Sequence, residues 1–149
     1  MHSHSHAVRV YFEDTDAGGV AYHANYLRWA ERARTESLRD IGLPHQLMME
    51  RHHSLLVVRR IEVAYLRPAR LDDEIVVETR VLKAGAASVE VGQDVVAAGG
   101  AMVARMRVGL VCVSQDSLRP VALPEPWRSA LRPGSPPARW VAAPLRARG

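Results

Sequence analysis

The chain has 149 residues, and none of its apolar runs approaches the about 20 residues that a membrane-spanning helix requires. Its formal net charge is +4, but residues 1–118 carry 14 Lys and Arg against 15 Asp and Glu, so the basic excess lies in the C-terminal segment. A nearly neutral body argues against a nucleic-acid-binding face. The only cysteine, Cys112, excludes an intrachain disulfide, and the N-terminus lacks the pattern of a secretory signal, so we expect one cytoplasmic domain.

The N-terminal third of the chain contains one strand pattern, one loop and the start of a helix. Residues 1–6 alternate His with Ser and Met, and we expect an unstructured terminus or an expression remnant. Residues 7–12 alternate apolar and polar side chains, which predicts a short strand. Two acids and a glycine pair follow, where the backbone can turn sharply and a ligand can approach the main chain.

A single long helix is predicted at about residues 24–41, because small and apolar side chains recur there at spacings of three, four and seven. Asn25 is a favourable residue for its N-cap, and Gly42 followed by Pro44 predicts its end. Residues 44–54 then predict a polar connection, in which three histidines are solvated and do not ligate a metal.

Four segments rich in valine and isoleucine predict strands at residues 55–65, 75–83, 88–97 and 101–113. The connections 84–87 and 98–100 have hairpin lengths, and we expect the four strands to follow one another in hairpin order. Cys112 falls on the apolar face of the last strand and is interpreted as a core residue.

The C-terminal part becomes rich in Pro, Ala and Arg after residue 118. We expect Trp127 and Leu131 to dock on the domain and residues 133–149 to be disordered. Residues 7–132 would then form one α+β domain, a five-stranded antiparallel sheet with the helix on one face.

Asp14 and Asp16 lie just before the predicted helix start. A helix N-terminus offers unpaired N–H groups and a partial positive charge, so a carboxylate beside it pairs a base or nucleophile with an anion-stabilising site. Acyl-transfer hydrolysis requires that combination. From the residues alone, a turn-forming acid is an equally good interpretation of Asp16. Asp14 would point the other way in an extended segment, and we interpret it as structural.

Residues 11–26 are Tyr-Phe-Glu-Asp-Thr-Asp-Ala-Gly-Gly-Val-Ala-Tyr-His-Ala-Asn-Tyr. This stretch resembles the signature of hotdog-fold acyl-CoA thioesterases of the 4-hydroxybenzoyl-CoA thioesterase-like superfamily, and within it the group associated with the Tol-Pal system. The similarity continues through residues 65–73 and covers about residues 7–125. The resemblance implies a hotdog domain, in which the sheet wraps around the long helix. It also implies a homodimer with sheets joined edge to edge, or a homotetramer built from two such dimers.

The same resemblance implies roles for individual residues in hydrolysing an acyl-CoA or acyl-carrier-protein thioester, with no cofactor and no metal. Asp16 matches the catalytic aspartate, as nucleophile or as general base. The backbone N–H of His23 matches the group that polarises the thioester carbonyl, and the imidazole could also transfer protons. The residues expected to contact substrate are Gly19, Tyr22, Asn25 and Tyr26. Those considered for the phosphates of coenzyme A are Arg67, Arg70 and Lys83.

Two other functions stay open at this point, a non-catalytic acyl-CoA-binding hotdog protein and a hotdog dehydratase acting on hydroxyacyl thioesters. Asp16 argues against the first, because binding alone needs no carboxylate beside the thioester. The motif does not resemble the acid–histidine arrangement expected for the second. No Gly-x-Ser-x-Gly elbow or metal-ligand cluster supports another hydrolase class. The Arg-rich tail leaves open a weak association with envelope machinery or an anionic membrane.

Overall fold

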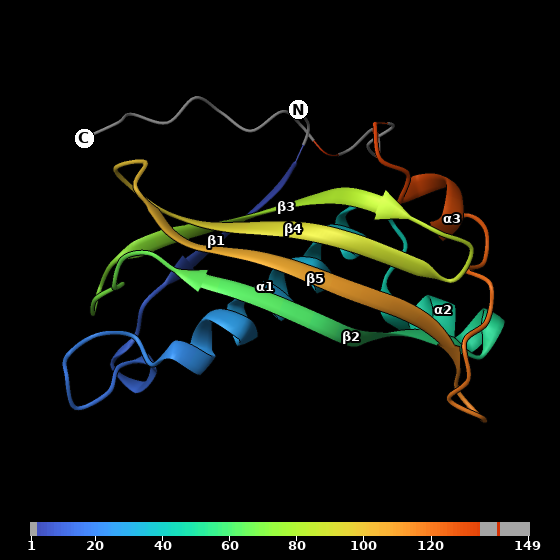
Figure 1. The fold of residues 1–149 in the computed structure, drawn as a ribbon, viewed down its shortest axis with the longest axis horizontal. Coiled ribbons are helices and arrows are strands. Elements are labelled where there is room, and N and C mark those ends of the chain that lie inside the picture. Colours follow the sequence, from blue (N-terminus) through green and yellow to red (C-terminus); the bar gives the residue numbers. More distant parts are fainter. Residues whose placement is uncertain (1–2, 135–139, 141–149) are drawn as a thin grey trace.

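The structure is a computed structural model that describes residues 3–134 and 140 (Figure 1). Its elements in chain order are β1 (His4–Arg9), the 3-10 turn η1 (Phe12–Asp14), α1 (His23–Asp40), α2 (His45–His52), β2 (Ser54–Tyr65), β3 (Glu74–Ala84), β4 (Ser88–Ala97), β5 (Met102–Ser114) and α3 (Trp127–Ala130). No helix in the described part of the chain is both long and apolar enough to cross a bilayer.

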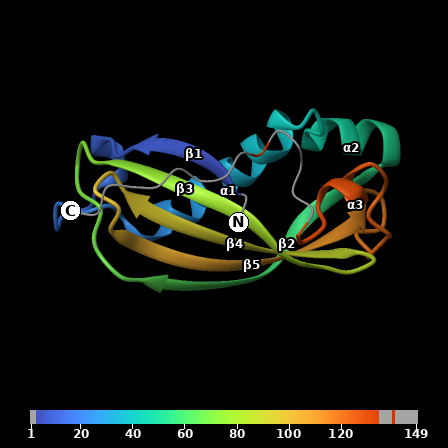
Figure 2. The same cartoon turned by 90° about the horizontal axis from the view of Figure 1, so that it is seen from above.

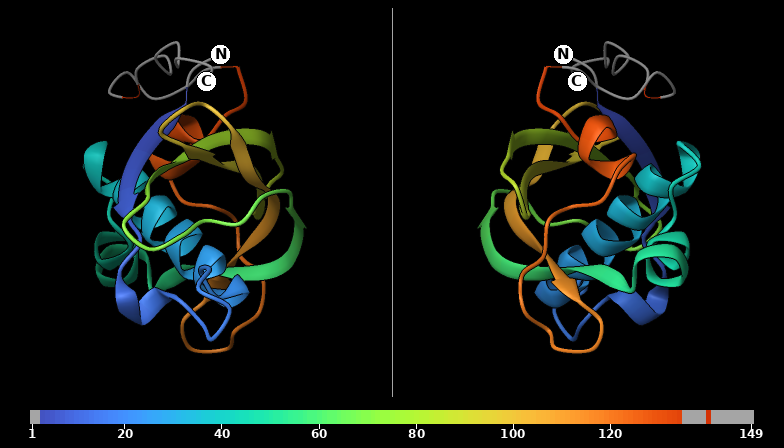
Figure 3. Two further views of the ribbon diagram at one scale, coloured as in Figure 1. Left: turned by 90° about the vertical axis from the view of Figure 1, so that its left-hand side faces the viewer. Right: turned by 90° about the vertical axis from the view of Figure 1, so that its right-hand side faces the viewer.

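The five strands form one antiparallel sheet in the order β1-β3-β4-β5-β2. The sheet curves around α1, and the end-on views show the helix lying along its concave face (Figure 3). This is the expected hotdog arrangement. The apolar stripe of α1 faces the sheet, with Tyr26, Trp29 and Ala33 almost fully buried. Small side chains such as Ala33 let the helix backbone lie close to the strands.

The predicted hairpin order is confirmed for β3, β4 and β5 and is wrong for β2. β2 pairs with β5 at the edge of the sheet, and β3 lies between β1 and β4. The connection 66–73 is longer than a tight turn, and its backbone lies against the loop before α1. The N–H of Ala21 in that loop donates to the carbonyl of Ala69 in the connection at 2.7 Å. This placement ties the loop to the sheet.

The first strand begins at His4, three residues earlier than expected, and ends at Arg9. The prediction of an unstructured terminus is wrong for residues 4–6, because β1 pairs with β3 from His4 opposite Thr79 onward. The His4 imidazole Nε2 also lies 2.6 Å from the Asp40 carboxylate. The polar local sequence gave no sign of these long-range contacts. Residues 1–2 lie outside the described residues.

Residues 44–54 contain a second helix, α2, where a polar loop was predicted. Pro44 sits at its N-cap, and Met48 is fully buried against the domain. The helix is too short for a repeated apolar stripe, which explains why periodicity did not reveal it. Two views place α2 and α3 at one end of the molecule and the loop of residues 10–22 at the other (Figures 1 and 2).

The C-terminal segment docks where Trp127 and Leu131 were expected to do so, and both are buried. The indole N–H of Trp127 donates to the carbonyl of Leu43 at 3.0 Å. Trp140 is also buried and donates to the carbonyl of Ser37 at 3.1 Å, so the prediction of disorder is wrong at this residue. Residues 135–139 and 141–149 lie outside the described residues.

Candidate functional site

The loop between β1 and α1 folds back on itself, and backbone contacts hold it in place. The backbone of Thr15 bridges that of Ala21, and Val20 bridges Arg70 in the connection after β2. The carbonyl of Asp14 accepts hydrogen bonds from the Tyr22 N–H and from the Asn25 side-chain amide, both at 2.8 Å. The loop is therefore fixed against the first turn of α1.

Asp16 lies at the turn of this loop with its side chain exposed. Its Oδ1 accepts a hydrogen bond from the Gly18 N–H at 2.8 Å, and its carbonyl accepts one from the Gly19 N–H at 3.0 Å. Gly19 has φ +76°, a left-handed conformation that a residue with a Cβ adopts only with strain. Within residues 3–134 and 140, no donor forms a hydrogen bond to Oδ2. One carboxylate oxygen is thus oriented by the turn, while the other accepts no hydrogen bond from the described residues.

His23 is the first residue of α1, and its backbone N–H makes no hydrogen bond to another described backbone group. The initial N–H groups of a helix have no intrahelical partner and concentrate the positive end of the macrodipole. The His23 carbonyl accepts a hydrogen bond from the Tyr65 hydroxyl at 2.9 Å, which links the helix start to the end of β2. The His23 ring lies 4.5 Å from that of Tyr22, measured between ring centroids.

Tyr22 and Tyr26 have different environments. Tyr22 is 46% exposed beside His23, whereas Tyr26 is buried, and burial raises the pKa of its hydroxyl. The Tyr26 hydroxyl accepts a hydrogen bond from the Ala69 N–H at 3.0 Å, and its ring packs edge-on against Tyr65. Tyr26 therefore supports the connection 66–73 from within the core, and its contact with substrate stays a prediction.

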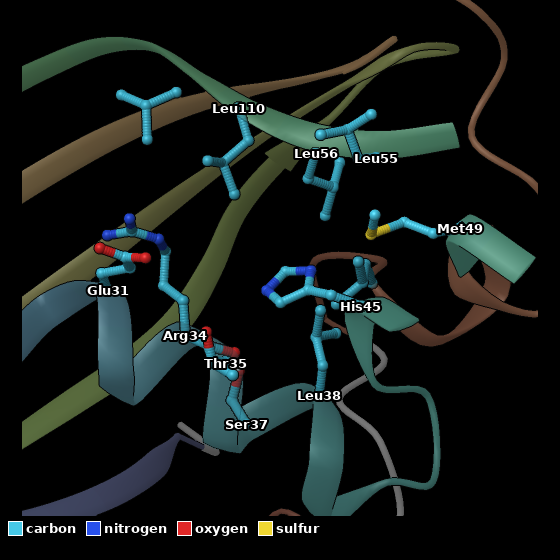
Figure 4. A pocket seen from close by; sticks show the side chains of 12 residues that line it. Glu31, Arg34, Thr35, Ser37, Leu38, His45, Met49, Leu55, Leu56 and Leu110 are labelled. Carbon is cyan, nitrogen blue, oxygen red and sulfur yellow. Dashed lines mark hydrogen bonds between the residues drawn. The ribbon is translucent and has the colours of Figure 1, made fainter. Parts of the chain in front are cut away.

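A cavity of about 460 Å³ lies further along α1, between this helix, α2 and the start of β2 (Figure 4). Such a volume suits a small organic ligand, since ligand sites commonly measure about 300–1,000 Å³. Its walls are mainly apolar, with Arg34, Glu31 and His45 as the ionisable groups. The apolar lining residues are Leu38, Met49, Leu55, Leu56, Val58, Leu110 and Leu131.

Residues 10–131 match the model of the thioesterase-like superfamily. The chain belongs to this superfamily. It is 40% identical over 126 residues to the acyl-CoA thioesterase YbgC of Haemophilus influenzae, covering 85% of this chain and 92% of the relative. It is 42% identical over 118 residues to the acyl-CoA thioester hydrolase YbgC of Escherichia coli O6:H1, covering 79% and 87% respectively. The crystal structure of a probable thioesterase from Bartonella henselae matches with a TM-score of 0.77 at 33% identity, covering 82% of this chain and 99% of that one.

Asn25 lies in the first turn of α1 and Lys83 near the end of β3, and their expected contacts with substrate stay predictions. Asn25 is not the N-cap, which is Tyr22; it lies inside the first turn, and its buried amide ties α1 to Asp14. Lys83 lies near the far end of β3, whereas the loop that holds Asp16 contacts residues at the start of that strand. The length of β3 therefore separates Lys83 from Asp16 within one chain.

Arg67 and Arg70 are both exposed in the connection after β2. Arg70 is adjacent to the loop, since its backbone bridges Val20. The Arg70 N–H donates to the Asp73 carboxylate at 2.9 Å, which fixes the backbone of this connection. Both side chains are exposed near the Asp16 loop, and their contact with phosphate stays a prediction. The described residues include no group of three His, Cys, Asp or Glu side chains gathered as metal ligands.

Sequence reasoning missed Arg34 and Gln93, which join the half-buried guanidinium in the cavity wall to a fully buried amide on the sheet. Gln93 is fully buried on β4; its amide donates to the Ala30 carbonyl at 2.9 Å and to the Thr79 hydroxyl at 3.0 Å. Its carbonyl oxygen accepts a hydrogen bond from Arg34 Nη1 at 2.9 Å. The signal in the sequence was a glutamine between Val91 and Val95 on the apolar face of a strand.

Proposed function

We propose that the protein hydrolyses acyl-CoA thioesters to the free acid and thiol, with Asp16 as the nucleophile or general base. The observation that carries this proposal is the Asp16 carboxylate, oriented by the Gly18 N–H in a loop whose Asp14 carbonyl binds the N-terminal turn of α1, in a member of the thioesterase-like superfamily. Relatives that cover most of the chain are named acyl-CoA thioesterases or thioester hydrolases.

The chemistry needs a group that delivers an oxygen nucleophile and a donor that stabilises the oxyanion. Asp16 supplies the first in one of two ways. It attacks the thioester carbonyl, which expels the thiolate and leaves an acyl-aspartyl anhydride that water hydrolyses, or it removes a proton from a water that attacks the carbonyl and expels the thiolate. The His23 N–H supplies the second, because it donates no hydrogen bond to a described backbone group and the helix dipole favours negative charge there. The bond to Tyr65 holds this donor in place during the reaction.

The complete site is proposed to need two copies of the chain. β2 pairs with β5 on one side only, and a long edge strand left unpaired is an open template for another strand. Antiparallel pairing of two β2 strands about their midpoints would set Ser54 of one copy opposite Tyr65 of the other. The Tyr65 hydroxyl donates to the carbonyl of His23 at the start of α1, and Leu55 and Leu56 line the cavity. A cavity in one copy would therefore face the Asp16 loop of its partner.

This two-copy arrangement explains how a cavity distant from its own Asp16 can serve the reaction. Arg34 lies eleven residues beyond His23, which is about 16 Å along the same helix. The acyl group would extend into the cavity of one copy while its thioester lies at the Asp16 loop of the other. Arg67 and Arg70, at the rim of that loop, are proposed to meet the phosphates of coenzyme A.

A thiol-release assay over a panel of acyl-CoA esters, with wild type and Asp16→Asn, tests the proposal. We expect Asp16→Asn to lower kcat by at least about 10², the scale typical for loss of a base or nucleophile. Glu13→Gln is the matched control, since Glu13 is an exposed acid in the same loop region. Binding of acyl-CoA without turnover by wild type would identify a binding protein instead, and undiminished turnover by Asp16→Asn would remove Asp16 from the mechanism.

A further inference from the structure

The most unusual group in the cavity is the side chain of Arg34, which rises from α1 toward the strands (Figure 4). Within the described residues, its hydrogen bond is the one that Nη1 donates to Gln93, and it forms no ion pair within 4.0 Å. A guanidinium has five N–H donors, so most of them remain available. Gln93 is itself immobilised by Ala30 and Thr79, and it therefore fixes where the guanidinium lies.

The electrostatic environment of Arg34 leaves its charge poorly compensated. Burial lowers the pKa of the guanidinium, and the charge of Glu31 only partly opposes that effect. An arginine nevertheless stays protonated in proteins. Burial likewise lowers the pKa of His45, so this neighbour is neutral at pH 7. The cavity thus places the Arg34 guanidinium, with the Glu31 carboxylate on the same helix, beside leucine and methionine side chains, where its remaining N–H donors can bind an acceptor oxygen of a ligand.

The chemical character of the cavity walls favours some ligands over others. The leucines of α1, β2 and β5 offer contact to a hydrocarbon chain, whereas the phosphates of coenzyme A would meet mostly apolar walls. A hydrocarbon with an oxygen at its far end satisfies both parts of the cavity, because the chain contacts the leucines and the oxygen accepts from Arg34.

We infer that this cavity receives the distal part of the acyl group and that Arg34 donates a hydrogen bond to an oxygen there, which makes Arg34 a specificity-determining residue. The inference rests on the proposed thioesterase function. It predicts that acyl groups with a terminal carboxylate or hydroxyl are preferred over the matching unsubstituted chain. Carboxylate and hydroxyl share the required acceptor oxygen, and a substrate series separates them.

The experiment compares hexanoyl-CoA, ω-hydroxyhexanoyl-CoA and adipoyl-CoA as substrates of wild type, Arg34→Met and Arg34→Lys. The measured quantity is the ratio of kcat/KM for each oxygenated substrate to that for hexanoyl-CoA. Because both values come from one preparation, the ratio does not depend on the fraction of folded enzyme. Arg39→Met is the matched control, since Arg39 is an exposed arginine at the end of the same helix.

We expect wild type to favour at least one oxygenated substrate and Arg34→Met to lower that ratio by about ten- to a hundredfold, as for loss of a hydrogen bond to a charged group. Arg34→Lys should retain part of the preference, and Arg39→Met all of it. A ratio that Arg34→Met leaves unchanged, or a wild type that prefers hexanoyl-CoA, would overturn the role of Arg34. If no acyl-CoA is hydrolysed in an Asp16-dependent manner, the proposed function itself is wrong, and the inference is overturned with it.

Discussion

Replacing Gly18 by alanine should displace the Asp16 carboxylate, which we propose to be catalytic, without unfolding the loop. A Cβ at Gly18 would lie 3.2 Å from Asp16 Oδ1, the same oxygen that now accepts the Gly18 N–H at 2.8 Å. This contact is tighter than ordinary van der Waals packing, so the carboxylate must move by a few tenths of an ångström. A misplacement of about 1 Å can lower an enzymatic rate about 10²-fold, so we expect kcat to fall about three- to tenfold.

The neighbouring Gly19→Ala is the matched comparison. No atom lies within 4 Å of a Cβ built there, so the carboxylate is not touched, but the φ of +76° is strained for alanine. That strain is about 1–2 kcal/mol and should lower the free energy of unfolding, with kcat less affected than in Gly18→Ala. Saturating acyl-CoA turnover and urea unfolding of both variants provide the two readouts. Full kcat in Gly18→Ala would show that the orientation of Asp16 by this turn does not matter for the reaction.

Three further predictions concern the oxyanion donor, the assembly and the cysteine. His23→Ala keeps its backbone N–H and should lose much less activity than Asp16→Asn. A folded His23→Pro lacks this N–H and should lose at least as much activity as Asp16→Asn. An alanine variant as inactive as Asp16→Asn would make the imidazole essential. Light scattering at micromolar concentration should give at least twice the chain mass of 16.5 kDa, and a fully active monomer would refute the two-copy site. Cys112 is fully buried, and burial raises the pKa of its thiol, so it should react with a thiol reagent only after denaturation; rapid labelling of the native protein would contradict its core position.

Local patterns were sufficient for the parts of the fold that are stabilised locally. The stripe that begins at Tyr26 predicted α1, which starts at His23 and ends before Gly42 as expected. The glycine-containing connections predicted the β3–β4 and β4–β5 hairpins, because turn residues act within a few positions of the chain. The loop of residues 10–22 and the helix start are adjacent in sequence, so local sequence was enough to predict that Asp16 lies shortly before the start of α1, and the joint role of Asp16 and His23 in one site stays a prediction.

The remaining features depend on residues that are distant in sequence. The pairing of β2 with β5 and of β1 with β3 is decided by which edges of the sheet are free when the strands meet, and a strand pattern does not specify its partner. Tertiary contacts also stabilise residues 45–52 as a helix. They place Lys83 one strand length away from the loop that holds Asp16.

The cavity illustrates the same division. The sequence alone shows Arg34 among many arginines and Gln93 within a valine-rich strand, with no indication that they meet. Only the curved sheet brings β4 beneath α1, where the amide of Gln93 fixes the guanidinium of Arg34. The sequence therefore determined the helix, the turns and the loop that carries Asp16 through local periodicity and backbone conformation. The tertiary structure decided the strand partners and the charge in the cavity, because both depend on burial against residues far away along the chain.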